Sequence, residues 1–182
     1  GMAFRKKGLL DNAIEAYKKV LEIKPDLYQT YYNLGIAYRD KNEPDESIKY
    51  FEKTLEFIPN DADTHRCIAD IYFTFKKDYQ KAINHYIESI KLRPNNHITY
   101  FNLANAYRAT FQFDEAIKNY QMAIEIMPDY VSAYINIGST YMDTGKVEQA
   151  FDYYQKAFEL DEENPLIYYN LGVACYKLGI MN

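Results

Sequence analysis

The sequence predicts an all-α fold, a solenoid of antiparallel helix pairs, because one pattern returns about every 34 residues. A Leu or Ile followed by a small residue recurs in steps of 34, 35, 34 and 34 residues, at Leu34, Ile68, Leu103, Ile137 and Leu171. A small residue in a second segment recurs with the same steps, at Ala13, Ser47, Ala82, Ala116 and Ala150. An aromatic residue follows each of these four positions later, at Tyr17, Phe51, Tyr86, Tyr120 and Tyr154.

Each repeat is expected to form two amphipathic helices joined by a short turn. In the second repeat, Tyr31, Leu34 and Tyr38 have the spacing of one helical face. Residues 40–44 form a turn signal that ends in proline, and a second apolar stripe follows through Phe51. A proline closes most repeats, which favours a break before the next helix pair.

The pattern divides the chain into full repeats at 28–61, 62–96, 97–130 and 131–164. Residues 1–27 form a partial repeat, and residues 165–182 supply the first helix of a further one. The repeat at 62–96 has one extra residue, which we expect in the turn around residues 76–78, where insertions cost least. Because no polar end cap follows, we expect either a piece of a longer protein or a chain that self-associates.

Two kinds of residue are expected to mark the helix ends. Gly8, Gly145 and Gly179 occupy the slot of Asn42, and both residue types tolerate the left-handed conformation that ends a helix. Phe111 stands in the same slot, where we expect a packed turn. Polar residues that follow the closing prolines are candidate caps of the next helices: Asp26, Asn60, Asn95 and Asp129.

The chain resembles the tetratricopeptide repeat (TPR) family in four features. These are the 34-residue period, the aromatic residue, Leu-Gly and Tyr of the first helix, the Ala and Tyr of the second helix, and the closing proline. The resemblance covers essentially the whole chain. It implies a right-handed superhelical solenoid, a single TPR array over residues 1–182, and a protein–protein interaction scaffold with a peptide-binding groove. The departures are His65 and Cys175 in aromatic positions and Phe111 in the turn.

Composition and motifs argue against most other classes of function. The chain has 21 basic and 26 acidic residues, a formal net charge of −5, which argues against nucleic acid as a partner. No apolar run is long enough to span a membrane. Cys67 and Cys175 have neither disulfide nor metal-ligand spacing, so we expect a reducing, intracellular location, cytoplasmic or alternatively nuclear.

No catalytic or cofactor motif is present. The histidines, His65, His85 and His97, form no His-x-x-x-His pair for zinc, and there is no phosphate-binding glycine loop. We therefore expect no metal, no cofactor and no enzymatic activity in this chain, although it would suit the substrate-recruiting region of a larger enzyme.

Asparagine recurs at one outward slot of the first helices, at Asn33, Asn102, Asn136 and Asn170, and Cys67 takes this slot in the remaining repeat. Asn33 lies about 150° from the core direction at 100° per residue. A carboxamide both donates and accepts, so a row of them suits an extended peptide backbone. The row resembles the asparagine ladder of the TPR region of O-GlcNAc transferase, which implies that these four residues bind peptide in the concave groove.

Flanking positions add to the predicted peptide-binding set. Tyr32, Arg66 and Phe101 come one residue before the Asn slot, while Arg39 and Arg108 come six residues after it. They predict a mixed groove with apolar shelves and Arg anchors. The alternative is that the aromatic residues pack between repeats.

Three alternatives remain open. In the first alternative, asparagine at this slot is only a polar residue that a helix surface tolerates, and it recurs because the repeats share ancestry. End-to-end self-assembly would join Phe4, Leu9 and Leu10 to Tyr168, Leu171 and Cys175, in a head-to-tail contact. A carboxylate clamp, the chaperone-tail site of some TPR proteins, is less favoured because Arg66 is the only basic residue in the place of its first lysine.

Overall fold

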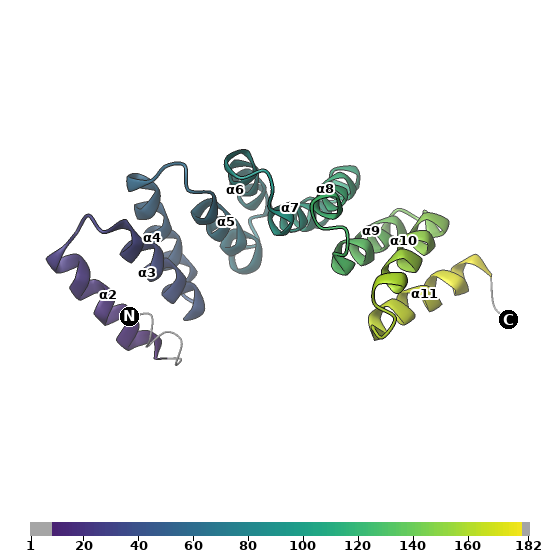
Figure 1. The fold of residues 1–182 in the computed structure, drawn as a ribbon, viewed down its shortest axis with the longest axis horizontal. Helices are drawn as coiled ribbons and strands as arrows, with labels where there is room; N and C mark the ends of the chain where they lie inside the picture. The colour runs from purple at the N-terminus through teal and green to yellow at the C-terminus, as the bar shows by residue number, and fades with distance from the viewer. Residues whose placement is uncertain (1–8, 180–182) are drawn as a thin grey trace. The chain divides into compact units, whose positions relative to one another are not determined.

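The computed structural model of the chain describes residues 9–179, which contain helices and no strand (Figure 1). The predicted all-α class is therefore confirmed. The helices cover, in order, Leu10–Ile23 (α2), Tyr28–Asp40 (α3), Pro44–Phe57 (α4), Ala62–Ile71 (α5), Tyr79–Leu92 (α6), His97–Ala109 (α7), Phe113–Ile126 (α8), Val131–Asp143 (α9), Val147–Leu160 (α10) and Pro165–Leu178 (α11), with a π-helical segment η1 at Tyr72–Lys76.

The chain divides into two compact units, Gly1–Pro94 and Asn95–Asn182. In each unit an odd-numbered helix, here called an A-helix, packs on the even-numbered B-helix that follows it: α3 on α4, α5 on α6, α7 on α8 and α9 on α10. The next A-helix of the unit also packs on that B-helix, as α5 does on α4 and α11 on α10. Every such contact joins neighbouring segments, as expected for a repeat protein.

Glycine in the A-helix lets the B-helix aromatic ring approach the backbone. A Cβ added at Gly35 would lie 2.7 Å from the Phe51 ring, and one added at Gly138 would lie 2.5 Å from the Tyr154 ring. Both rings are buried, so neither can move aside into solvent. Gly172 on α11 occupies the same slot, but a Cβ there would have no atom within 4 Å.

The extra residue of the third repeat lies in a helix, so its predicted place in the turn is wrong. In the other full repeats the left-handed turn residue comes four positions after the A-helix tyrosine, as Asn42 does after Tyr38. In the third repeat Lys77 comes five positions after Tyr72, and the residues between them belong to η1. A π-helical turn spans one residue more than an α-helical turn, so the helix absorbs the insertion while keeping its backbone hydrogen bonds.

The turn slot adopts the predicted left-handed conformation. The backbone angle φ is 64° at Asn42, 60° at Phe111, 76° at Gly145 and 71° at Gly179, while Gly8 lies outside the described residues. Phe111 is 80% exposed, and its ring meets the Phe113 ring edge-on, so this turn is not packed as expected. A left-handed backbone costs such a residue about 1–2 kcal/mol.

The predicted helix caps are wrong by one position. The side chains that cap A-helices are those of Asp61, Asn96 and Asn164, each in the residue directly before its helix. The residues that precede α3 and α9 are Leu27 and Tyr130, which have no capping side chain. Each expected cap belongs to the turn itself, because the residue that enters the helix comes one position later.

No helix in the described part of the chain has the length and apolar character needed to cross a membrane.

Candidate functional site

The amide of Asn33 lies in a pocket of about 400 Å³ in the first unit. Asn33 and Tyr32 line it from α3, Thr54 and Ile58 from the end of α4, and Asp61 and Asp63 from the start of α5. No residue between 9 and 179 hydrogen-bonds the side-chain amide of Asn33, which is half-buried. This amide is therefore available to both a donor and an acceptor of a bound peptide.

Asn136 has a different environment in the second unit. Its Nδ2 donates to Asn105 Oδ1 at 3.0 Å and to the Tyr120 hydroxyl at 3.4 Å. The Tyr120 hydroxyl in turn donates to Asn105 Oδ1 at 2.5 Å. Because Asn105 Oδ1 and the Tyr120 hydroxyl are 2.5 Å apart, one N–H of the Asn136 amide points at both, and the other N–H and Oδ1 are left for a ligand.

The other two members of the row are half-buried on their A-helices, Asn102 on α7 and Asn170 on α11. Among the residues that the structure describes, none hydrogen-bonds the Asn170 side chain. Cys67, which takes this slot on α5, is 1% exposed, and its Sγ lies 3.8 Å from the Tyr32 hydroxyl. Burial raises the pKa of the Cys67 thiol, so this position offers no reactive thiolate.

Sequence analysis did not anticipate a set of polar partners for the B-helix tyrosines. The Tyr86 hydroxyl donates to Asp70 Oδ1 at 2.7 Å, and the Tyr154 hydroxyl lies 3.3 Å from Ser139 Oγ. These partners and Asn105 come three residues after the Asn slot. Where the aromatic residue is Phe51, which has no hydroxyl, the facing residue is the apolar Ile36. The residue three positions after the Asn slot is thus polar where it faces a tyrosine and apolar where it faces Phe51, and this match could be read from the sequence.

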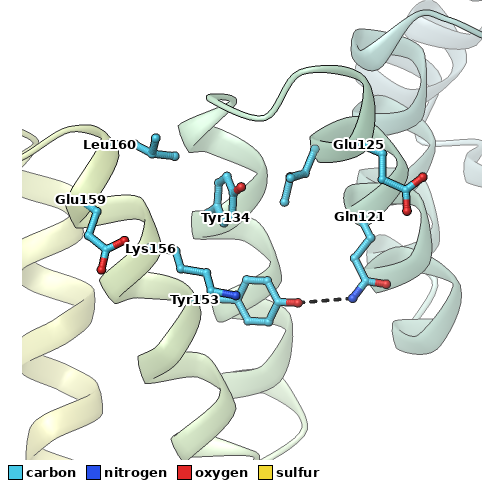
Figure 2. A pocket seen from close by; sticks show the side chains of 8 residues that line it. Gln121, Glu125, Tyr134, Tyr153, Lys156, Glu159 and Leu160 are labelled. Carbon is cyan, nitrogen blue, oxygen red and sulfur yellow. Dashed lines mark hydrogen bonds between the residues drawn. The ribbon is translucent and has the colours of Figure 1, made fainter.

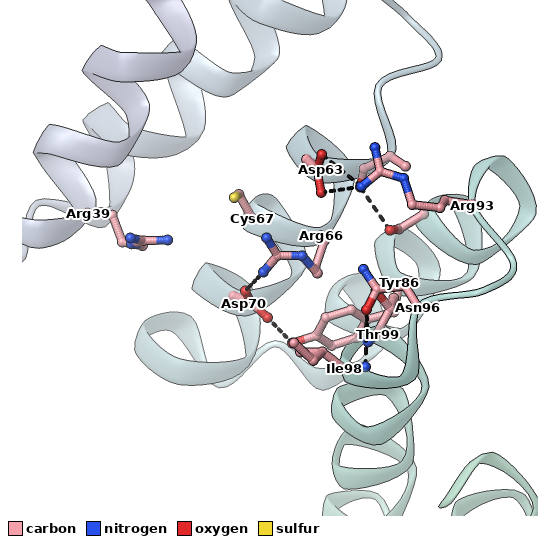
Figure 3. A network of polar contacts seen from close by, with 12 residues as sticks. Arg39, Asp63, Arg66, Cys67, Asp70, Tyr86, Arg93, Asn96, Ile98 and Thr99 are labelled. Atoms are coloured by element: carbon pink, nitrogen blue, oxygen red, sulfur yellow. Dashed lines mark hydrogen bonds and ion pairs between the residues drawn. The ribbon is translucent and has the colours of Figure 1, made fainter. Parts of the chain in front are cut away.

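The Arg residues of the predicted site are held by acidic neighbours. Arg66 Nη1 donates to Asp70 Oδ2 at 3.0 Å, while the other Asp70 oxygen accepts from Tyr86 (Figure 3). Burial and the Asp70 carboxylate raise the pKa of Tyr86, so its hydroxyl keeps the proton that it donates. In the same view Arg93 Nη1 contacts both oxygens of Asp63 at 2.9 Å.

The two remaining Arg residues differ in what they connect. Arg39 pairs with Asp40, its neighbour on α3, at 2.9 Å. Arg108 on α7 pairs with Asp143 on α9 at 2.7 Å, so it joins two repeats of the second unit. These pairs are partly exposed, so each contributes little to stability.

The predicted aromatic shelves are part of the packing. The Tyr32 ring meets the edge of the Phe51 ring at 5.5 Å, and its hydroxyl contacts Cys67 of the next repeat. Phe101 packs between Tyr120 and Tyr130, with ring centroids 5.5 and 5.0 Å away. Both side chains are half-buried, so one part of each ring packs in the fold and the other part stays exposed.

A second hollow lies away from the Asn row, between the B-helices α8 and α10 (Figure 2). It has a volume of about 690 Å³ and includes Tyr134 of α9 and Tyr153 of α10. Gln121 Nε2 donates to the Tyr153 hydroxyl at 3.3 Å, and Lys156 Nζ lies 5.1 Å from the centre of the Tyr153 ring. Glu125 and Glu159 outnumber the single lysine, so the lining is weakly acidic.

Comparisons with known proteins agree with this architecture. Tetratricopeptide repeat models match residues 28–61 and 60–129, and a TPR repeat model matches residues 1–41 and 138–179. The chain is similar to the crystal structure of MamA, with 31% identity over 88% of this chain and 94% of that one, and a TM-score of 0.83. The comparison with curated proteins finds no match.

Two further solved structures share the fold. YrrB, described as a TPR protein with an unusual peptide-binding site, has 22% identity over 92% of this chain and 86% of that one, with a TM-score of 0.80. The APC/C hetero-tetramer Cut9–Hcn1 has 19% identity over 95% of this chain and 34% of that one, with a TM-score of 0.76. These likenesses confirm the predicted solenoid fold.

Proposed function

The chain belongs to the tetratricopeptide repeat family, and we propose that it is an interaction scaffold that binds an extended peptide segment through the A-helix asparagines. Protein–protein interaction is the function that the family fold indicates. The finer proposal assigns peptide binding to Asn33, Asn102, Asn136 and Asn170, with Tyr32, Phe101, Arg39, Arg66 and Arg108 at the edges of the binding surface.

The observation that carries this proposal is the environment of Asn33. Its amide lies beside the Tyr32 ring in the 400 Å³ pocket, and no described side chain or backbone group uses its hydrogen bonds. An amide in such a place supports pairing with one peptide N–H and one peptide C=O. Asn136, with one N–H shared between Asn105 and Tyr120, would use its other N–H and its Oδ1 for a peptide C=O and N–H.

The energy available from the row limits its role. One neutral hydrogen bond contributes about 0.5–1.5 kcal/mol, so four contribute about 2–6 kcal/mol if they add. Micromolar binding requires about 8 kcal/mol. The row would therefore give weak and permissive binding. Specificity must come from side chains of the peptide that contact the pocket and the Arg residues.

The proposal predicts that replacing all four asparagines by alanine removes the bound proteins in a pull-down from cell lysate. A matched control replaces the exposed Asn12, Asn60, Asn84 and Asn95, which lie outside the row. Because Asn136→Ala also breaks contacts to Asn105 and Tyr120, a triple variant that keeps Asn136 is compared for helicity and melting. If the same proteins stay bound to the well-folded variants, the row does not bind peptide.

End-to-end self-association is a second candidate, supported by the open face of α11. Tyr168 is 56% exposed and a Cβ added at Gly172 would meet no atom within 4 Å, whereas the same face of α3 and α9 is covered by a B-helix. At the opposite end Leu9 is 45% exposed, and Phe4 lies outside the described residues.

Light scattering at high protein concentration tests this second candidate. If α11 mediates association, the chain will show oligomers that Gly172→Leu reduces, because the new side chain fills the open slot. A strict monomer, or oligomers that Gly172→Leu leaves unchanged, would exclude association through this face.

A further inference from the structure

The pocket of about 400 Å³ in the first unit has a counterpart in the second unit that is filled by an aromatic ring. In the first unit, Tyr28 and Tyr32 line the pocket, one turn apart on α3. The corresponding residues two repeats later are His97 and Phe101 on α7. The Tyr130 ring packs against both of them, with its centroid 5.1 Å from that of His97 and 5.0 Å from that of Phe101.

Asp61 takes the place of this ring in the first unit. It is the residue directly before α5, as Tyr130 is the residue directly before α9. Because an aspartate side chain is much shorter than a tyrosine side chain, the space that a ring fills in the second unit stays open here as part of the pocket. The Tyr130 ring therefore indicates the shape of an occupant: a flat group that lies against two side chains of the A-helix.

The Asp61 carboxylate has hydrogen-bonding capacity left for such an occupant. Its Oδ2 accepts from the backbone N–H of Thr64 at 3.0 Å and from the Thr64 hydroxyl. Between residues 9 and 179, no group donates to its Oδ1 and no lysine or arginine pairs with it. An ionised carboxylate has about four acceptor positions, so Asp61 can accept from further donors in the pocket.

The charge of the pocket favours a cation. Among the described residues that line it, two are acidic, Asp61 and Asp63, and none is basic. Asp63 pairs with Arg93, whose Nη1 lies 2.9 Å from both carboxylate oxygens (Figure 3). Arg66 on the same helix pairs with Asp70. The uncompensated charge at the pocket is therefore that of Asp61, which attracts a cationic group and repels a carboxylate or a phosphate.

We propose that this pocket binds one arginine side chain of the peptide, with the guanidinium against Tyr28 and Tyr32 and its N–H groups on Asp61. A guanidinium is flat, stacks on aromatic rings and donates to a carboxylate in a fixed geometry. It therefore matches both the shape that Tyr130 indicates and the charge of Asp61. This inference rests on the proposed peptide binding, because the Asn33 amide at the same pocket would hold the backbone next to the arginine.

Arginine is expected to bind more tightly than the other side chains of similar length. The lysine ammonium is a compact and strongly hydrated charge without a flat surface, so it pairs with Asp61 but gains less from the two rings. Citrulline has nearly the shape of arginine but no charge, so it retains contact with the rings and loses the charge-assisted hydrogen bonds.

NMR titration of the isotope-labelled chain with short peptides tests the proposal. The probes are acetyl-Gly-Gly-Arg-Gly-Gly-amide and the same peptide with lysine or citrulline in place of arginine. We expect the arginine peptide to shift the backbone signals of Tyr32, Asn33 and Thr64 saturably. It should bind more tightly than the lysine peptide, and at least about tenfold more tightly than the citrulline peptide.

Two variants of Asp61 separate charge from shape. Asp61→Asn removes the charge and keeps a capping side chain of the type found at Asn96 and Asn164. It should weaken binding of the arginine peptide at least about tenfold and leave the citrulline peptide unchanged. Asp61→Tyr should abolish binding of the arginine peptide, because the new ring fills the pocket as Tyr130 does. Asp78→Asn is the matched control, since Asp78 caps α6 in the same way outside the pocket.

The proposal is overturned if the lysine or citrulline peptide binds as tightly as the arginine peptide, or if Asp61→Asn does not weaken binding. Asn33→Ala tests the underlying peptide binding, since it should weaken all three peptides by the same factor. If only Asn33→Ala weakens binding, backbone recognition stands and the arginine pocket is wrong. If only Asp61→Asn weakens it, the arginine pocket stands and the role of Asn33 is wrong. No saturable binding of any of the peptides would overturn both.

Discussion

Gly138→Ala is expected to destabilise the protein by about 1–3 kcal/mol, and Gly138→Leu by more, because any Cβ at this position overlaps the Tyr154 ring. That ring is 2% exposed and cannot leave the core without opening a cavity. The same change at Gly172 is expected to stabilise the protein by up to about 1 kcal/mol, since alanine favours a helix over glycine and nothing there obstructs the new methyl group.

Chemical denaturation of the native chain and of the two alanine variants measures this difference. Because repeat proteins can unfold in parts, hydrogen exchange of α9 and α10 provides a local measurement, and it should increase only in Gly138→Ala. Equal stability of the two variants would show that the close approach of Tyr154 to α9 does not exist in solution.

Phe51→Tyr is expected to destabilise the protein by about 1–3 kcal/mol, because it buries a hydroxyl beside Ile36, where no partner accepts its hydrogen bond. Adding Ile36→Asn to that variant should recover part of the loss, because it reproduces the pair that Tyr120 and Asn105 form in the fourth repeat. Ile36→Asn alone should be destabilising, since its amide would then be buried against an apolar ring.

A double-mutant cycle over these two positions gives the coupling energy, which we expect to be about 1–3 kcal/mol in favour of the double variant. Tyr120→Phe with Asn105→Ile provides the reverse cycle, in which a polar pair becomes an apolar one. If the two changes simply add in both cycles, the Tyr-to-polar correspondence has no energetic basis.

The helix pairs were predictable from the sequence because their signals are local and repeated. Leu34 and Ile137 are buried where the periodicity places them. The left-handed turn at Asn42, Gly145 and Gly179 was also predictable, since it depends on the backbone preference of a single residue. A repeat supplies several independent copies of each such signal, which makes the pattern readable in one sequence.

Features that depend on contacts between helices were not predictable in the same way. The sequence around Lys77 is compatible both with a longer turn and with a π-helical segment, so it does not show which of the two takes up the extra residue. The helical angle predicts an outward direction for Asn136, but its bonds to Asn105 and Tyr120 depend on side chains from other segments. His65 and His85 are 20 residues apart on different helices, so no periodicity within one helix predicts the contact between their rings.

The matched Tyr–polar and Phe–apolar pairs restrict how this protein can be recombined. Each pair joins the A-helix and B-helix of one repeat, as Asp70 and Tyr86 do between α5 and α6. Gene shuffling with crossovers between repeats would transfer both members together and keep the pair intact. A crossover in the turn inside a repeat would join Ile36 to a tyrosine or Asp70 to a phenylalanine. The natural exchange unit of this chain is therefore the whole helix pair, which sets where chimaeric junctions should be placed.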